Sequence, residues 1–129
     1  MAKKLELYRC NICGNLIEVI LEGAGEIVCC GEHMELLEEK NNTSESGEKH
    51  VPVISDYNET FKKITVNNHP MQKEHYITFI QAYSKEKNEI CLKYLHPEEK
   101  AEFTVPSSIN LKSREFCNIH GLWGEKFSE

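Results

Sequence analysis

The chain has 129 residues, of which 40% are hydrophobic and 28% are charged, and its formal net charge is −6. This size allows one ordinary domain, or a very small domain joined to a modest one. The negative charge and the lack of a basic stripe argue against nucleic acid as a partner. No apolar run approaches the roughly 20 residues that cross a bilayer, so no membrane partner is expected. The first residues lack the apolar core of a secretory signal, and we expect a cytoplasmic protein.

Residues 1–37 are predicted to form a small domain of short strands around turns. The segments 5–8, 16–21 and 27–28 are rich in strand-forming residues, and a glycine-containing turn separates the last two. Such a short piece buries too little apolar surface to be stable alone. We therefore expect a bound metal to hold this domain together.

Four cysteines in this part have the spacing of a metal site. They form one C-x2-C pair and one adjacent pair: Cys10, Cys13, Cys29 and Cys30. Adjacent residues of a strand point to opposite faces, so binding one metal with both requires a local kink. Gly14 and Gly31 follow the two pairs and allow unusual backbone angles. His33 lies close by, but four thiolates already complete a tetrahedron, so we assign it to the exposed surface.

The identity of the metal at the four cysteines stays open at this point. Sulfur tetrahedra suit both iron and zinc, so a zinc ribbon that only holds the fold is one alternative. A disulfide pair is another. In a reducing compartment, however, closely spaced cysteines more often bind metal than form disulfides.

A polar, turn-rich segment at 41–47 is the predicted linker to a second domain, which covers 38–129. Strand-like segments then recur at intervals of about 8–12 residues, which is typical of an antiparallel β-sandwich. They are 51–54, 61–66, 75–83, 89–95 and 102–105. Alternation within 75–83 predicts one face with Ile77, Phe79 and Tyr83 and another with Tyr76, Ile80 and Ala82.

The second part carries a different group of metal-binding residues. The group consists of His50, His69, His75, Cys117 and His120. Four neutral imidazoles in a plane, with a thiolate opposite an open position, would form a square-pyramidal site. This donor set suits a reactive iron better than a structural zinc. The thiolate is a strong donor that pushes electron density onto iron, which favours electron transfer to an oxygen species at the open position.

Each of these residues taken alone has a simpler interpretation. A histidine can be an unrelated surface residue, and a cysteine can be a buried free thiol; only the set of five favours a site. His96 precedes Pro97 in a predicted turn and is assigned to the surface. Cys91 lies in an apolar strand and is interpreted as a core thiol, because a buried free cysteine behaves as a small hydrophobic residue.

Together these motifs resemble those of the desulfoferrodoxins, the two-iron class of superoxide reductases, over essentially the whole chain. Besides the cysteine pattern, the motifs are Glu48-Lys49-His50-Val-Pro-Val, His69-Pro-Met-x3-His75 and Glu115-x-Cys117-Asn-x-His120. The resemblance implies an all-β protein. A desulforedoxin-like, rubredoxin-type domain at 1–37 would precede an immunoglobulin-like antiparallel β-sandwich at 38–129. It also implies a homodimer.

The resemblance further implies two irons per chain, one Fe(Cys)4 and one Fe(His)4Cys. The first would be bound by Cys10, Cys13, Cys29 and Cys30, where zinc can substitute. The second would have His50, His69, His75 and His120 as equatorial ligands and Cys117 as axial ligand. Lys49 would attract superoxide and stabilise charge on the bound oxygen. Glu48 would bind the oxidised iron as a sixth ligand, because a carboxylate is a hard donor.

The implied activity is the one-electron reduction of superoxide to hydrogen peroxide at the ferrous His4Cys centre, with electrons from a rubredoxin-like donor. The main alternative is a non-enzymatic electron-transfer iron protein, in which only the thiolate iron matters. A zinc-stapled binding module without a redox role is a second alternative. Metal content and a visible spectrum would distinguish the three.

Overall fold

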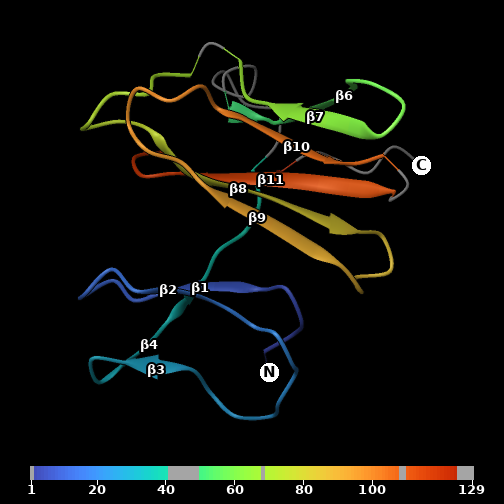
Figure 1. The fold of residues 1–129 in the computed structure, drawn as a ribbon. Helices are drawn as coiled ribbons and strands as arrows, with labels where there is room; N and C mark the ends of the chain where they lie inside the picture. The colour runs from blue at the N-terminus through green and yellow to red at the C-terminus, as the bar shows by residue number, and fades with distance from the viewer. Residues whose placement is uncertain (1, 41–49, 68, 108–109, 125–129) are drawn as a thin grey trace. The chain divides into compact units, whose positions relative to one another are not determined.

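The structure, a computed structural model, describes residues 2–40, 50–67, 69–107 and 110–124 (Figure 1). The chain divides into two compact units, Met1–Glu38 and Glu39–Glu129. The predicted linker at 41–47 lies outside the described residues, as do Glu48 and Lys49. Within the described ranges, no helix is long and apolar enough to cross a membrane.

The first unit is built from very short strands. In one antiparallel sheet β1 (Leu7–Arg9) lies between β2 (Leu16–Glu18) and β5 (Glu35–Leu36), and β3 (Val28–Cys29) pairs with β4 (Glu32–His33) in a hairpin. Its buried apolar side chains are Leu5, Leu7, Cys10, Val19 and Met34. So small an apolar centre agrees with the prediction of short strands that need a further source of stability.

The second unit is an antiparallel β-sandwich of two sheets. One sheet has the strand order β12-β11-β8-β9 and the other has the order β10-β7-β6. The strands are β6 (Val53–Asp56), β7 (Phe61–Thr65), β8 (Ile77–Ser84), β9 (Ile90–Tyr94), β10 (Glu102–Pro106), β11 (Leu111–Cys117) and β12 (Gly121–Gly124). The predicted fold class is confirmed: an all-β protein in which a small desulforedoxin-like domain precedes an immunoglobulin-like antiparallel β-sandwich.

The core of the second unit lies between these two sheets. Ile64 of β7 and Val105 of β10 pack with Ile80 and Ala82 of β8, and all four side chains are at most 1% exposed. Each buried isoleucine or valine contributes about 1.5–3 kcal/mol relative to an exposed one. Cys91 of β9 packs against the same cluster and is partly buried, as a core thiol should be.

A β-bulge in β8 changes the face that Ile77 occupies. Phe116 of β11 is opposite Phe79, but the next residue, Cys117, is opposite Ile77 and not Thr78. The extra residue reverses the alternation before it, so Ile77 joins the core while Phe79 stacks on Phe116. The prediction that Ile77 shares a face with Phe79 is therefore wrong, because simple alternation assumes an unbroken strand.

Candidate metal centres

The four cysteine sulfurs of the first unit converge on one point. The sulfurs of Cys10, Cys13, Cys29 and Cys30 all lie within 4.8 Å of one another. The Sγ atoms of Cys13 and Cys29 are 3.6 Å apart, and those of Cys29 and Cys30 are 3.9 Å apart. A tetrahedral metal with bonds of about 2.3 Å to sulfur places its sulfurs about 3.8 Å apart, so this arrangement fits one metal ion. The cysteines are free, so the disulfide alternative is wrong.

The backbone around the adjacent cysteines has the predicted kink. Cys30 has a φ of 55°, and Gly31 and Gly14 have φ values of 77° and 84°. Left-handed backbone of this kind is unfavourable for residues with a Cβ, and glycine adopts it without that penalty. The glycine after each pair therefore lets the chain turn back so that both sulfurs of the pair face the same point.

Local contacts prepare these thiols for a cation. The backbone N–H of Cys13 donates to Cys10 Sγ at 3.4 Å. This N–H and that of Ile12 lower the pKa of the Cys10 thiol to about 6. The interaction with Cys13 and the other nearby sulfurs raises the pKa of Cys30 to about 12. Four crowded sulfurs thus resist full ionisation until a positive metal ion compensates their charge.

The imidazoles of the second unit form a closed ring of four. The ring centres of His50 and His69 are 4.5 Å apart, those of His69 and His75 4.9 Å, those of His75 and His120 4.9 Å, and those of His120 and His50 4.6 Å. If four imidazole nitrogens bind one metal at about 2.1 Å, neighbouring ring centres are roughly 4.5 Å apart. The observed spacing fits four imidazoles in one plane around a single ion.

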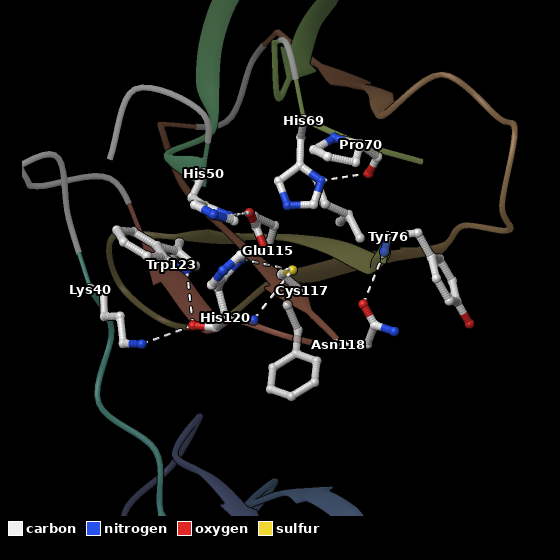
Figure 2. Close-up of polar contacts among 12 residues, drawn as sticks. Lys40, His50, His69, Pro70, Tyr76, Glu115, Cys117, Asn118, His120 and Trp123 are labelled. Carbon is white, nitrogen blue, oxygen red and sulfur yellow. Dashed lines mark hydrogen bonds and ion pairs between the residues drawn. The ribbon is translucent and has the colours of Figure 1, made fainter. Parts of the chain in front are cut away.

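Cys117 joins this ring of imidazoles (Figure 2). The ligand atoms of Cys117, His50, His69 and His120 all lie within 4.8 Å of one another, and Cys117 Sγ is 3.8 Å from His120 Nδ1. His75 lies outside this tightest group, but its ring is next to those of His69 and His120. The structure thus brings together all five residues that the sequence singled out. Four of them form the tightest group, and His75 lies next to it.

Unpaired buried nitrogens point to a missing partner in this ring. His69 donates its Nδ1–H to the carbonyl oxygen of Pro70 at 2.6 Å, which leaves Nε2 as the acceptor atom. Within the described part of the chain, Nε2 of His69 and Nε2 of His75 are buried without a hydrogen-bond partner. Burying such an acceptor unpaired costs free energy, and a metal ion would satisfy both nitrogens. The residues present therefore fit a metal.

Burial keeps the imidazoles in the form that binds metal. Burial, with smaller contributions from the neighbouring imidazoles, lowers the pKa of His50 to about 4 and also lowers the pKa of His69 and of His120. All three rings are therefore neutral at pH 7, as metal ligands must be. Burial raises the pKa of the Cys117 thiol, although the N–H groups of His120 and Ile119 oppose this shift.

Trp123 and Lys40 support two of the four histidines. The Trp123 ring stacks on His50 at 4.6 Å with 12° between the planes. Trp123 Nε1 and Lys40 Nζ both donate to the carbonyl oxygen of His120, at 3.2 Å and 2.8 Å (Figure 2). Sequence reasoning missed both residues. The available signal was that the only tryptophan in the chain lies three residues after His120.

Glu115 is a buried carboxyl beside His50. Its Oε2 is 3.7 Å from His50 Nδ1, and neither carboxyl oxygen has a hydrogen-bond partner among the described residues. Burial raises the pKa of Glu115 to about 9. A carboxyl group behind a ligating histidine commonly fixes the orientation of the ring, and Glu115 is the carboxyl group that lies next to His50 Nδ1.

The remaining two histidines, His33 and His96, are members of neither cluster. His33 is exposed and 3.7 Å from Glu26, and His96 is exposed and 2.6 Å from Glu99. Neither is among the residues grouped around a possible ion in the described part of the chain. Their assignment to the surface agrees with this.

Fold and site together define an all-β protein with one four-thiolate centre and one imidazole–thiolate centre. Residues 2–37 match the family model described as "Desulfoferrodoxin, N-terminal domain", and residues 42–126 match the one described as "Desulfoferrodoxin". The chain belongs to the desulfoferrodoxin family. The two clusters fit the two iron centres of that family.

Relatives extend over nearly the full chain. A desulfoferrodoxin of Syntrophotalea carbinolica is 44% identical, covering 98% of this chain and 99% of the relative. A desulfoferrodoxin homolog of Archaeoglobus fulgidus is 44% identical, covering 95% and 98%. The crystal structure of the superoxide reductase from Treponema pallidum is similar in fold, with a TM-score of 0.72 and 24% identity over 98% of this chain and 100% of that one.

Proposed function

We propose that this protein is a superoxide reductase that converts superoxide to hydrogen peroxide at the imidazole–thiolate centre. The observation that carries the proposal is the ring of four imidazoles with the Cys117 thiol inside the same cluster. Bound there, ferrous iron supplies one electron to superoxide, and two protons complete the peroxide. Relatives in the family and a structural neighbour named as a superoxide reductase support this assignment.

The five side chains divide the work between holding iron and adjusting it. His50, His69, His75 and His120 bind as neutral rings, so they leave the positive charge of the metal available to an anion. Cys117 supplies negative charge and electron density to the metal. The N–H of His120 donates to Cys117 Sγ at 3.4 Å, which holds this sulfur in place and moderates its donation.

A cysteine pair in the same unit tests this proposal. Cys117→Ser should abolish the thiolate-to-iron charge-transfer colour of the oxidised centre and the fast reaction with superoxide in pulse radiolysis. Cys91→Ser, at the core thiol of β9, should retain both. Wild-type protein should contain two irons per chain. A single iron without rapid superoxide reaction would instead favour an electron carrier, and colour that survives in Cys117→Ser would contradict the ligand assignment.

Lys49 and Glu48 are part of the same proposal because they directly precede His50 in the sequence. The net charge of −6 means that attraction of an anion must be local, and the Lys49 ammonium supplies it. Lys49→Ala should slow association with superoxide about tenfold and weaken its dependence on ionic strength. Lys100→Ala, at an exposed lysine before β10, serves as the control. Equal bimolecular rates for wild type and Lys49→Ala would remove Lys49 from the mechanism.

The supply of electrons completes the proposal. A rubredoxin-like donor would re-reduce the imidazole–thiolate centre, and the four-thiolate iron is a candidate relay. Homodimer formation is proposed on the family resemblance. Free, metal-grouped cysteines favour a reducing compartment, which supports a cytoplasmic location.

A further inference from the structure

Asn118 contacts the backbone on both sides of His75. Its Oδ1 accepts a hydrogen bond from the Tyr76 N–H at 2.9 Å, and its Nδ2 donates to the Glu74 carbonyl oxygen at 3.0 Å. Its own N–H donates to the Tyr76 carbonyl oxygen at 3.1 Å. Figure 2 shows the first of these contacts. Three hydrogen bonds thus join the residue after Cys117 to the segment that carries His75.

The segment around His75 is closed mainly on itself. The His75 N–H donates to the Gln72 carbonyl at 3.0 Å, and the Gln72 N–H donates to the His75 carbonyl at 2.9 Å, which makes a tight turn. These bonds fix the shape of the turn but not its distance from Cys117. Asn118 lies in the turn between β11 and β12, and its side chain makes the hydrogen bonds that join the His75 turn to the residue after Cys117.

His75 is the most widely spaced of the four rings. Its centre is 4.9 Å from each neighbouring ring, whereas His50 is 4.5 and 4.6 Å from its neighbours. We propose that Asn118 is a positioning residue that holds His75 in the plane of the other three imidazoles. An amide suits this task because it donates to one carbonyl and accepts from one N–H at the same time. The inference depends on the proposed metal site, but not on superoxide as its substrate.

The test is a double-mutant cycle on the full-length protein. Affinity of the imidazole–thiolate centre for ferrous iron is measured by chelator competition. The iron left in the centre is then measured, after the chelator is removed and the protein is oxidised, from its thiolate-to-iron charge-transfer band. Asn118→Ala should weaken binding by about 10–100-fold, as loss of an outer-shell partner does. In a His75→Ala background the same change should lower the iron affinity less than about threefold, because the ligand through which Asn118 acts is already absent. Asn58→Ala is the matched control, since Asn58 Oδ1 accepts from Thr60 and Phe61 in the β6–β7 turn.

Equal losses of affinity from Asn118→Ala in the two backgrounds would overturn the inference, because Asn118 would then act independently of His75. Unchanged affinity in the otherwise wild-type chain would overturn it as well. If Asn118→Ala does not fold, Asn118→Asp keeps the size and the acceptor and goes through the same cycle. An effect of the added charge on iron affinity would appear in both backgrounds. The effect of losing the hydrogen bond from Asn118 Nδ2 should appear only where His75 is present. Iron affinity is measured without superoxide. The result for Asn118 can therefore be interpreted even if the protein proves not to be a superoxide reductase.

Discussion

Trp123 contacts two ligands that lie far apart in the sequence of the second unit. Its ring lies flat against His50, which precedes β6, while its indole N–H donates to the carbonyl of His120, which precedes β12. The side chain is only 2% exposed. Stacking restricts the tilt of the His50 ring, and the hydrogen bond fixes the backbone that carries His120. One aromatic residue therefore couples the positions of two imidazoles.

Replacing Trp123 separates these two effects. Trp123→Phe keeps a ring against His50 but loses the N–H, whereas Trp123→Leu loses both. We expect Trp123→Leu to weaken iron binding at this centre by at least about tenfold and to destabilise the metal-free unit by about 2–4 kcal/mol. Trp123→Phe should fall between Trp123→Leu and wild type. Chelator competition and urea unfolding measure the two quantities, and wild-type iron affinity in both variants would contradict the supporting role.

Ligand type and spacing are local properties of the sequence, and for this reason the five residues of the second cluster could be named without a structure. Their supports could not be named in this way. Lys40 donates to the carbonyl of His120, a residue 80 positions later in the chain. Asn118 reaches back more than 40 positions to residues 74 and 76. Such contacts depend on tertiary packing, which no short-range pattern encodes.

At the scale of elements, β8 and β11 position Cys117 through the bulge. The Thr78 hydroxyl donates to the Phe116 carbonyl at 3.0 Å, at the point where the regular pairing is interrupted. Directly after this, Cys117 pairs with Gly121 across the turn to β12. Gly121 has a φ of 85°, so this turn uses left-handed backbone to bring Cys117 and His120 close together.

Gly121→Ala tests how much this turn depends on glycine. A Cβ at this position would meet only Lys40 Nζ at 3.9 Å, an ordinary contact, so the cost arises from the backbone angle. We expect a loss of about 1–2 kcal/mol of stability in the second unit, measured by urea unfolding of the metal-free protein. Gly25→Ala, with no positive φ and no atom within 4 Å, should be neutral or slightly stabilising. A neutral Gly121→Ala would show that the turn can relax.

The strand that carries Cys117 was missing from the sequence prediction, as was β12, although the five strands β6 to β10 were found. Charged and polar residues dominate its middle, which is atypical of a central strand. In the structure the two positive charges of this strand have partners. Lys112 and Arg114 lie 2.7 Å and 3.5 Å from the Glu39 carboxylate, and Arg114 donates to Gln81 at 2.6 Å. Because tertiary pairing compensates the buried charge, the hydrophobic pattern alone could not reveal β11.

At the scale of the whole molecule, the two units obtain their stability in different ways. The second unit has a core contributed by both sheets of a sandwich. The first unit has strands of only two or three residues, and one of its few buried side chains is the thiol of Cys10. Metal binding to a site that exists only in the folded state is itself folding free energy, of about 10–16 kcal/mol for structural zinc in small domains. The first unit should therefore depend on its metal for folding.

Cys13→Ser tests this dependence, because it removes one thiolate whose side chain is exposed and whose loss leaves no cavity in the core. In the full-length variant we expect amide hydrogen exchange to become fast throughout residues 2–37, while the core strands β7, β8 and β11 stay protected. Iron content should fall from two to one per chain, and the charge-transfer colour of the Cys117 centre should persist.

Reconstituting the metal-free wild-type protein with zinc should restore protection in the first unit without the visible bands of its iron, since the tetrahedral thiolate site accepts either metal. Loss of protection in β8 and β11 of the Cys13→Ser variant would mean that the sandwich relies on the first unit, and the separation of structural and reactive metal between the units would be refuted.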